Sequence, residues 1–244
     1  MGGTRGVVGA TRGAMTTVGD LPAYRAAPEA EGSWPGMVLV HEAFGLDDVM
    51  RRHADRVAAM GHVVLAPDLF ARGRTISCLR STFRALQRGR GPAFDDIEAA
   101  RAELVADPRC AGTVGVIGFC LGGSFALILA GRGGWGASVA NYGQLPPDPA
   151  VLDGACPVVA SFGGRDHFLR GAATKLEVAL SERGVPHDVK EYPAAGHSFL
   201  NDEDNAPWYA MPVTRLVLHA GPEPESAADA WIRIEAFLAE HLTS

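Results

Sequence analysis

Residues 110–131, CAGTVGVIGFCLGGSFALILAG, carry no charged side chain, and this segment leaves few folds open to the chain. An apolar run of this length can cross a membrane as one helix. Its two halves differ, because TVGVIGF is rich in β-branched residues and SFALILA in helix formers, with glycines between them. The segment therefore predicts a buried strand, a tight turn and a buried helix, and not a membrane span.

The same alternation of strand and helix continues along the chain. Short runs typical of buried strands occur at 36–41, 62–67, 113–119, 137–142, 157–162 and 188–192. Apolar residues at helical spacing predict helices at 47–60, 94–105, 121–130, 170–183 and 225–241. The arginine-rich segment 74–90 is either a helix or a lid. This pattern predicts a doubly wound α/β fold, a mostly parallel sheet with helices on both faces.

Composition narrows the class of protein. A chain of 244 residues that is 47% hydrophobic can bury a large core, which excludes disorder for most of its length. The net charge of -6 argues against a nucleic-acid-binding protein. We expect a flexible glycine-rich tail over 1–16, in which Met15 is an alternative start to Met1, and a single domain over 17–244. Residues 205–221 show only an irregular, partly apolar pattern.

The cysteines and the N-terminus predict a cytoplasmic protein. Cys78, Cys110, Cys120 and Cys156 are widely spaced and form no CxxC pair, which disfavours zinc and thioredoxin-like sites. A domain of this size needs no disulfides, and residues 1–17 contain no continuous apolar segment of a secretory signal. We expect no metal or other cofactor, since neither HExxH nor a glycine-rich nucleotide motif is present.

Three of the predicted strands end at side chains that can perform chemistry. Gly118-Phe119-Cys120-Leu121-Gly122 is G-x-C-x-G, the nucleophile-elbow pattern with sulfur in place of oxygen. Asp166 follows the strand at 157–162, and His197 follows the strand at 188–192. Carboxyl ends of parallel strands share one edge of a sheet, so these side chains should meet. Nucleophile, acid and histidine in this order are typical of α/β-hydrolases.

This order assigns a role to each residue. The helix dipole favours the Cys120 thiolate, His197 transfers protons, and Asp166 orients the imidazole. The backbone N–H groups of Leu121 and Ala43 would form the oxyanion hole. Taken singly, each side chain has a plainer interpretation, as a small core residue, a loop histidine or a helix cap. Their combination favours catalysis.

Four motifs in the same order resemble the dienelactone hydrolase family. They are VHEAFGLDDVMRRHADRVAAMGHVVLAPDLFAR, GVIGFCLGG, FGGRD and AAGHSF, and the resemblance spans roughly residues 37–200. It implies a triad of Cys120, His197 and Asp166, hydrolysis without a cofactor, and a small-molecule substrate. It also implies that Glu42 contacts the thiol and helps to control its ionisation.

One position departs from the family pattern. In typical members an arginine four residues beyond the catalytic histidine binds the substrate carboxylate, and this position is Asn201 here. The departure counts against a typical dienelactone as substrate. Asn201, Arg80 and Arg84 are the candidate substrate-binding residues. The plainer interpretation of the arginines in and beside segment 74–90 is a solvated face, and an anion-binding lid is the alternative; they are Arg72, Arg74, Arg80, Arg84, Arg88 and Arg90.

The sulfur nucleophile indicates the kind of ester. A thiolate leaves a tetrahedral adduct far more readily than an alkoxide, so Cys120 should act on enol lactones or aryl esters. Three alternatives stay open: an acyltransferase or thioesterase-like enzyme with the same triad, a non-catalytic ligand-binding relative, and a redox-sensing Cys120. We expect no nucleic-acid or membrane partner. The oligomeric state is open, and a monomer is compatible with the sequence.

Overall fold

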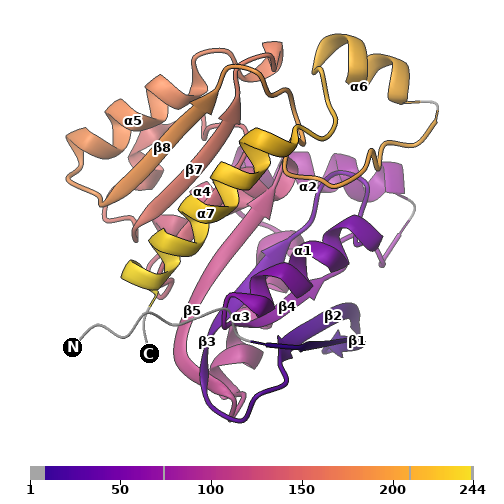
Figure 1. Ribbon diagram of the computed structural model, residues 1–244, viewed down its shortest axis with the longest axis vertical. Coiled ribbons are helices and arrows are strands. Elements are labelled where there is room, and N and C mark those ends of the chain that lie inside the picture. The colour runs from indigo at the N-terminus through magenta and orange to yellow at the C-terminus, as the bar shows by residue number, and fades with distance from the viewer. Residues whose placement is uncertain (1–8, 74, 209, 243–244) are drawn as a thin grey trace.

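Figure 1 shows the computed structural model, which describes residues 9–73, 75–208 and 210–242. Its strands are β1 (Thr11–Val18), β2 (Leu21–Pro28), β3 (Trp34–Val40), β4 (Val63–Pro67), β5 (Cys110–Phe119), β6 (Ser138–Asn141), β7 (Val158–Gly163) and β8 (His187–Tyr192). Its helices are α1 (Asp48–Ala59), α2 (Thr75–Arg88), α3 (Pro92–Ala106), α4 (Leu121–Ala130), α5 (Ala172–Glu182), α6 (Met211–Val217) and α7 (Pro224–His241). Two 3₁₀ turns, η1 (Pro149–Leu152) and η2 (His167–Leu169), complete the described elements.

The strands form one eight-stranded sheet in the order β1-β2-β4-β3-β5-β6-β7-β8. All pairs from β4 to β8 are parallel, whereas β1 and β2 add an antiparallel edge. Helices α1 and α7 lie in front of the sheet and α3 and α4 behind it (Figure 1). This arrangement confirms the predicted mostly parallel sheet with helices on both faces.

The register of the central strands brings their carboxyl ends to one edge. Val40, the last residue of β3, lies opposite Gly118 of β5, and Phe119 lies opposite Asn141 at the end of β6. Asn141 in turn pairs with Ser161, and Gly163 at the end of β7 pairs with Tyr192 at the end of β8. The loops that follow these strands therefore emerge side by side.

The uncharged segment 110–131 folds as expected. Its first half is the central strand β5, and every residue of α4 is buried. Contacts of β5 with β3, β6 and α4 explain why this segment tolerates no charge. No helix among the described residues has the length and apolar character needed to cross a membrane.

The expected tail over 1–16 is wrong for its second half. Residues Thr11–Val18 form β1, which pairs with β2 along its whole length from Thr11–Pro28 to Val18–Leu21. Most β1 side chains are exposed, so the strand has no apolar alternation, and its hydrogen bonds to β2 stabilise it instead. Residues 1–8 lie outside the described part of the chain.

Two segments without a clear sequence pattern contain helices. The irregular segment 205–221 contains the short helix α6, and segment 74–90 forms α2.

Candidate active site

Cys120 occupies a sharp turn between β5 and α4. Its backbone has φ 53° and ψ -113°, a left-handed conformation that non-glycine residues rarely adopt. The flanking glycines allow close approach of backbone: a Cβ on Gly118 would lie 1.9 Å from the carbonyl oxygen of Gly122. A Cβ on Gly122 would lie 2.0 Å from that of Val40. The G-x-C-x-G pattern is therefore a steric requirement of a turn that presents the thiol at the edge of the sheet.

His197 and Asp166 are hydrogen-bonded to each other at the same edge. His197 Nδ1 donates to Asp166 Oδ2 over 2.6 Å, and the carboxyl group is fully buried. Asp166 Oδ1 also accepts the backbone N–H of Phe168 at 3.0 Å, so this aspartate caps η2 as well as orienting the imidazole. The backbone N–H of His197 donates to the Leu218 carbonyl at 3.0 Å, which fixes its loop.

The other imidazole nitrogen is left for Cys120. His197 Nε2 is buried and has no hydrogen-bond partner among the described residues. Burial lowers the pKa of His197, but the charge of a Cys120 thiolate and the hydrogen bond with Asp166 raise it by more. The net pKa lies well above 6.5, so the imidazole can hold a proton beside the thiolate at neutral pH.

Glu42 lies fully buried just after β3, held by three donors. Ser198 Oγ donates to Oε1 at 3.0 Å, while Asn201 Nδ2 and Asn205 Nδ2 donate to Oε2 at 3.3 and 3.0 Å. Burial raises the pKa of Glu42, and the charge of His197 and these hydrogen bonds oppose the rise. Among the described residues Glu42 makes no hydrogen bond to Cys120, but both line the same cavity, and the contact with the thiol implied by the resemblance stays a prediction.

Asn201 is the centre of a buried network rather than an open substrate contact. Its Oδ1 accepts from His53 Nε2 at 3.0 Å and from the Tyr142 hydroxyl at 3.4 Å. Its Nδ2 donates to Glu42 and to Asn205 Oδ1, each over 3.3 Å. The side chain is only 3% exposed. Asn201 lies at the site, yet its polar atoms are used to hold Glu42.

The sequence did not indicate three members of this network. His53 lies on the apolar face of α1, where it resembles an ordinary core residue. Tyr142 follows β6, and Asn205 lies in a segment without a readable pattern. The one signal in the sequence was His53 itself: a polar side chain on the apolar face of a helix indicates a buried hydrogen-bond partner, since buried polar groups need one.

Arg80 and Arg84 are not brought to Cys120. Both are exposed on α2, and neither lines a cavity beside the thiol. His41 is buried beside Glu42. Its Nδ1 lies 2.7 Å from the Glu42 carbonyl, and its Nε2 accepts the Leu69 N–H at 3.0 Å. Burial lowers the pKa of His41, which suits a neutral ring that links two loops.

Two cavity lobes meet at Cys120 and His197. The first has a volume of about 200 Å³, and we call it the polar lobe after the carboxyl, amide and hydroxyl side chains among its lining residues, which are those of Glu42, Ser198, Asn201, Glu203, Asp204 and Asn205. It is also lined by Phe44, Ala206, Leu218 and Ala220, and most of its open surface is apolar. The apolar lobe, about 220 Å³, is lined by Phe83, Leu121, Tyr142, Phe168 and Leu169. Ala43 borders both lobes, and Leu121 begins α4, so its N–H has no acceptor within the helix. Both candidate oxyanion donors therefore lie beside the thiol.

A larger groove adjoins the apolar lobe. Its volume is about 590 Å³, and it runs between the loop at 144–152 and α5. Gln144, Phe168 and Leu169 border both the groove and the apolar lobe, but none of Cys120, His197 and Asp166 lines the groove. The groove therefore adjoins the candidate site without being lined by its three residues.

The parallel sheet, the elbow at Cys120 and the Asp166–His197 pair define an α/β-hydrolase fold and site. A profile of the dienelactone hydrolase family matches residues 21–242, and the chain belongs to this family. It is therefore a hydrolase.

Individual relatives agree with this assignment. A carboxymethylenebutenolidase of Rhodococcus opacus is 32% identical over 237 residues, which cover 90% of this chain and 86% of the relative. A carboxymethylenebutenolidase of Pseudomonas putida is 30% identical over 184 residues, 70% of this chain and 77% of the relative. The crystal structure of a dienelactone hydrolase-like promiscuous phosphotriesterase from metagenomic libraries superposes with a TM-score of 0.77 at 26% identity. That comparison covers 96% of this chain and 99% of the other.

Proposed function

We propose that this hydrolase cleaves small activated carboxylic esters or lactones through a thioester formed at Cys120. The observation that carries the proposal is the shared cavity, in which the elbow cysteine and the Asp166-bound imidazole of His197 face the same space. The relatives named carboxymethylenebutenolidase support a lactone as substrate. Lobes of about 200 and 220 Å³ suit a small molecule.

The reaction begins with attack of the Cys120 thiolate on the ester carbonyl. The N–H groups of Leu121 and Ala43 stabilise the oxyanion of the tetrahedral adduct. The adduct collapses, its C–O bond breaks, and the leaving oxygen takes the proton that His197 holds. The product of this half-reaction is the thioester of Cys120 and a free alcohol, or an enol that stays attached when the substrate is a lactone.

Water then completes the cycle. His197, now neutral, removes a proton from the water that attacks the thioester, while Asp166 stabilises the imidazolium that forms. The second adduct expels the Cys120 thiolate and releases the carboxylic acid, which loses its proton to solvent. Because a thiolate is the better leaving group than an alkoxide, the first step is efficient only for aryl or enol esters.

Turnover of phenyl acetate and of an enol lactone tests the proposal. Substitution of Cys120 by Ala should lower kcat/KM for both by at least about 10³-fold, because the covalent route is lost. Cys156→Ala is the matched control, since burial raises the pKa of that thiol to about 12 and it lies outside both lobes. Its activity should equal that of the wild type, with or without a chelator.

The competing hypotheses give different results in this assay. Full activity of the Cys120→Ala variant would contradict the thioester route. An acyltransferase would form more product with an added alcohol or thiol acceptor than with water alone. A ligand-binding relative would show no turnover of either ester while Cys120 still reacts with a thiol reagent.

A further inference from the structure

The polar lobe beside Cys120 offers carboxylate acceptors, and the cation among its described lining residues is the His197 imidazolium, which pairs with the thiolate. Three carboxylates line it, those of Glu42, Glu203 and Asp204, and no lysine or arginine is among its described lining residues. His197 and Cys120 both line this lobe, so it adjoins the candidate reaction site.

The amide groups of the lobe have no N–H left for a ligand. An asparagine amide has two N–H bonds to donate. Those of Asn201 reach Glu42 and Asn205, and those of Asn205 reach Glu42 at 3.0 Å and Asp47 at 2.9 Å. A carboxylate that entered the lobe would lose its water and find no replacement donor among these amides.

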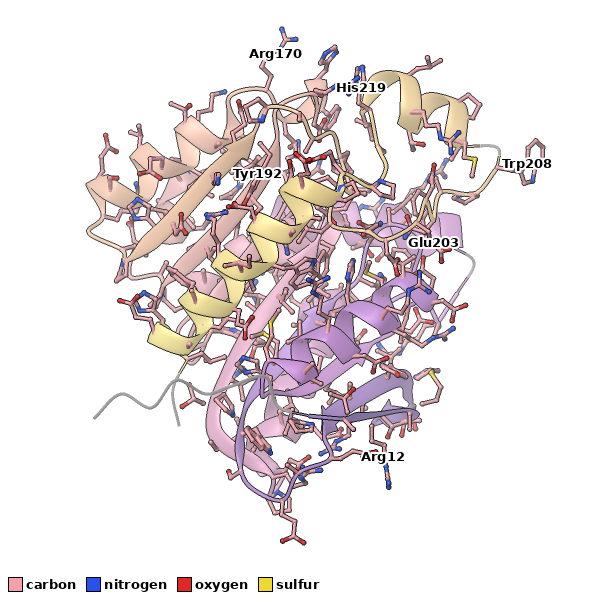
Figure 2. The ribbon with its side chains drawn as sticks, in the orientation of Figure 1. Arg12, Arg170, Tyr192, Glu203, Trp208 and His219 are labelled. Atoms are coloured by element: carbon pink, nitrogen blue, oxygen red, sulfur yellow. The ribbon has the colours of Figure 1, made fainter. Side chains whose placement is uncertain are left out.

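Charge around the lobe is also unfavourable to an anion. Five carboxylates line it or lie directly behind it, those of Glu42, Asp47, Asp202, Glu203 and Asp204. Two guanidinium groups face them: Arg52, within 2.7 Å of both Asp202 and Glu203, and Arg215, 3.0 Å from Asp204. With Glu42 protonated, four carboxylates still face three cations, the two guanidinium groups and the His197 imidazolium, and the Cys120 thiolate adds a further negative charge. In Figure 2, Glu203 lies on the loop that follows β8, on the side near α1.

From this lining we propose that the polar lobe selects substrates by charge. It accepts esters whose substituent in this lobe is uncharged or cationic and discriminates against a carboxylate. The proposal rests on the proposed ester hydrolase activity and assigns its substrate class. We assign the aryl group to the apolar lobe because Phe83, Tyr142 and Phe168 line it and can pack against an aromatic ring, and this orientation leaves the acyl substituent for the polar lobe.

Two esters that differ in one group test the inference. They are the monophenyl ester of trans-cyclobutane-1,3-dicarboxylic acid and the same ester with a carboxamide in place of the free carboxylate. The trans ring keeps the carboxylate from attacking its own ester. At low salt we expect kcat/KM to be at least about tenfold higher for the carboxamide, the size of one uncompensated charge contact in a site of intermediate dielectric. The ratio should shrink when NaCl is raised to about 500 mM.

Variants at Glu203 show whether the lining causes the preference. Glu203→Gln should reduce the carboxamide preference about twofold to threefold and Glu203→Lys about tenfold, mainly through faster turnover of the carboxylate ester. The described hydrogen bond of Glu203 is to Arg52, and it is exposed at the rim of the lobe. Neither variant should therefore disturb the packing of the core. Glu103→Gln removes the same charge from an exposed position on α3 and should leave the ratio unchanged.

Equal or faster turnover of the carboxylate ester by the wild type would overturn the charge selection. So would an unchanged ratio in Glu203→Lys. Phenyl acetate distinguishes this failure from failure of the hydrolase itself, because its hydrolysis depends on Cys120 and not on the lobe's charge. If phenyl acetate is cleaved but neither dicarboxylate ester is, their inhibition constants against phenyl acetate give the same comparison, and tighter inhibition by the carboxylate would again overturn the proposal.

Discussion

The buried side chain of His53 makes the stability of the fold depend on pH. Its Nε2 donates to Asn201, and its ring stacks on Phe119 with centroids 4.5 Å apart. Burial lowers the pKa of His53 to about 4, although the hydrogen bond with Asn201 opposes this change. Between about pH 4 and pH 6.5 the unfolded chain binds a proton here that the folded chain does not. The free energy of unfolding therefore falls as the pH falls through this window.

The variant His53→Gln keeps an N–H donor and cannot titrate. Between pH 7 and pH 4.5 we expect the wild type to lose about 2 kcal/mol more stability than the variant, because each unit of pKa shift is worth about 1.4 kcal/mol. Urea unfolding at the two pH values measures the difference. An equal loss in both proteins would contradict a neutral buried His53.

The turn from β5 to α4 is the element on which the site depends most. It forces Cys120 into a left-handed conformation, and it packs the backbone of α4 against the end of β3 through Gly122. Strain of this kind persists only where the surrounding structure holds it in place. Burial of the whole of α4 and pairing of β5 on both sides supply that support.

A methyl group at the turn should therefore be costly. We expect Gly122→Ala to lower the free energy of unfolding by more than about 3 kcal/mol or to prevent folding, because the new Cβ meets a fixed carbonyl. Gly133→Ala is the control: Gly133 has a φ of +72° with nothing within 4 Å of an added Cβ, so only about 1 kcal/mol of backbone strain is expected. Similar thermal melts for the two variants would refute the steric argument.

Across the whole molecule, aromatic contacts connect the C-terminal helix α7 to helix α1 and to the central strand β5. Trp231 of α7 lies with its ring centroid 5.3 Å from His53 of α1 and 6.0 Å from Phe119 of β5. The C-terminal helix therefore contacts α1 and the central strand as well as β7. That residues 17–244 form a single domain stays a prediction, which an unfolding experiment can test.

A single domain should unfold in one cooperative step. We expect the midpoint of urea unfolding to be the same by tryptophan fluorescence, which reports the packing of Trp231, and by far-ultraviolet circular dichroism, which reports the helices. Loss of phenyl acetate hydrolysis should follow the same curve. Two separated transitions would show that the halves of the sheet fold independently.

Much of the catalytic arrangement was readable because its signals are local. The strand, turn and helix over 110–131 follow from apolar runs interrupted by glycines, and the turn's geometry needs those glycines wherever the rest of the chain lies. Asp166 and His197 each follow a strand, and parallel strands end at a common edge. The expected fold is therefore confirmed, and the structure brings Asp166 and His197 together as expected, while their catalytic roles stay predictions.

The remaining features depend on contacts between distant residues. Strand β1 is exposed, so only its partner β2 makes it a strand, and it was mistaken for a tail. The arginines proposed to bind substrate point to solvent from α2, because no local pattern fixes the side on which that helix packs. Asn201 and Asn205 lie 159 and 163 residues beyond Glu42 in the sequence, yet both donate hydrogen bonds to its carboxylate. Hydrogen bonds of this kind carry no periodicity, and only the packed sheet brings them together to set the charge of the polar lobe.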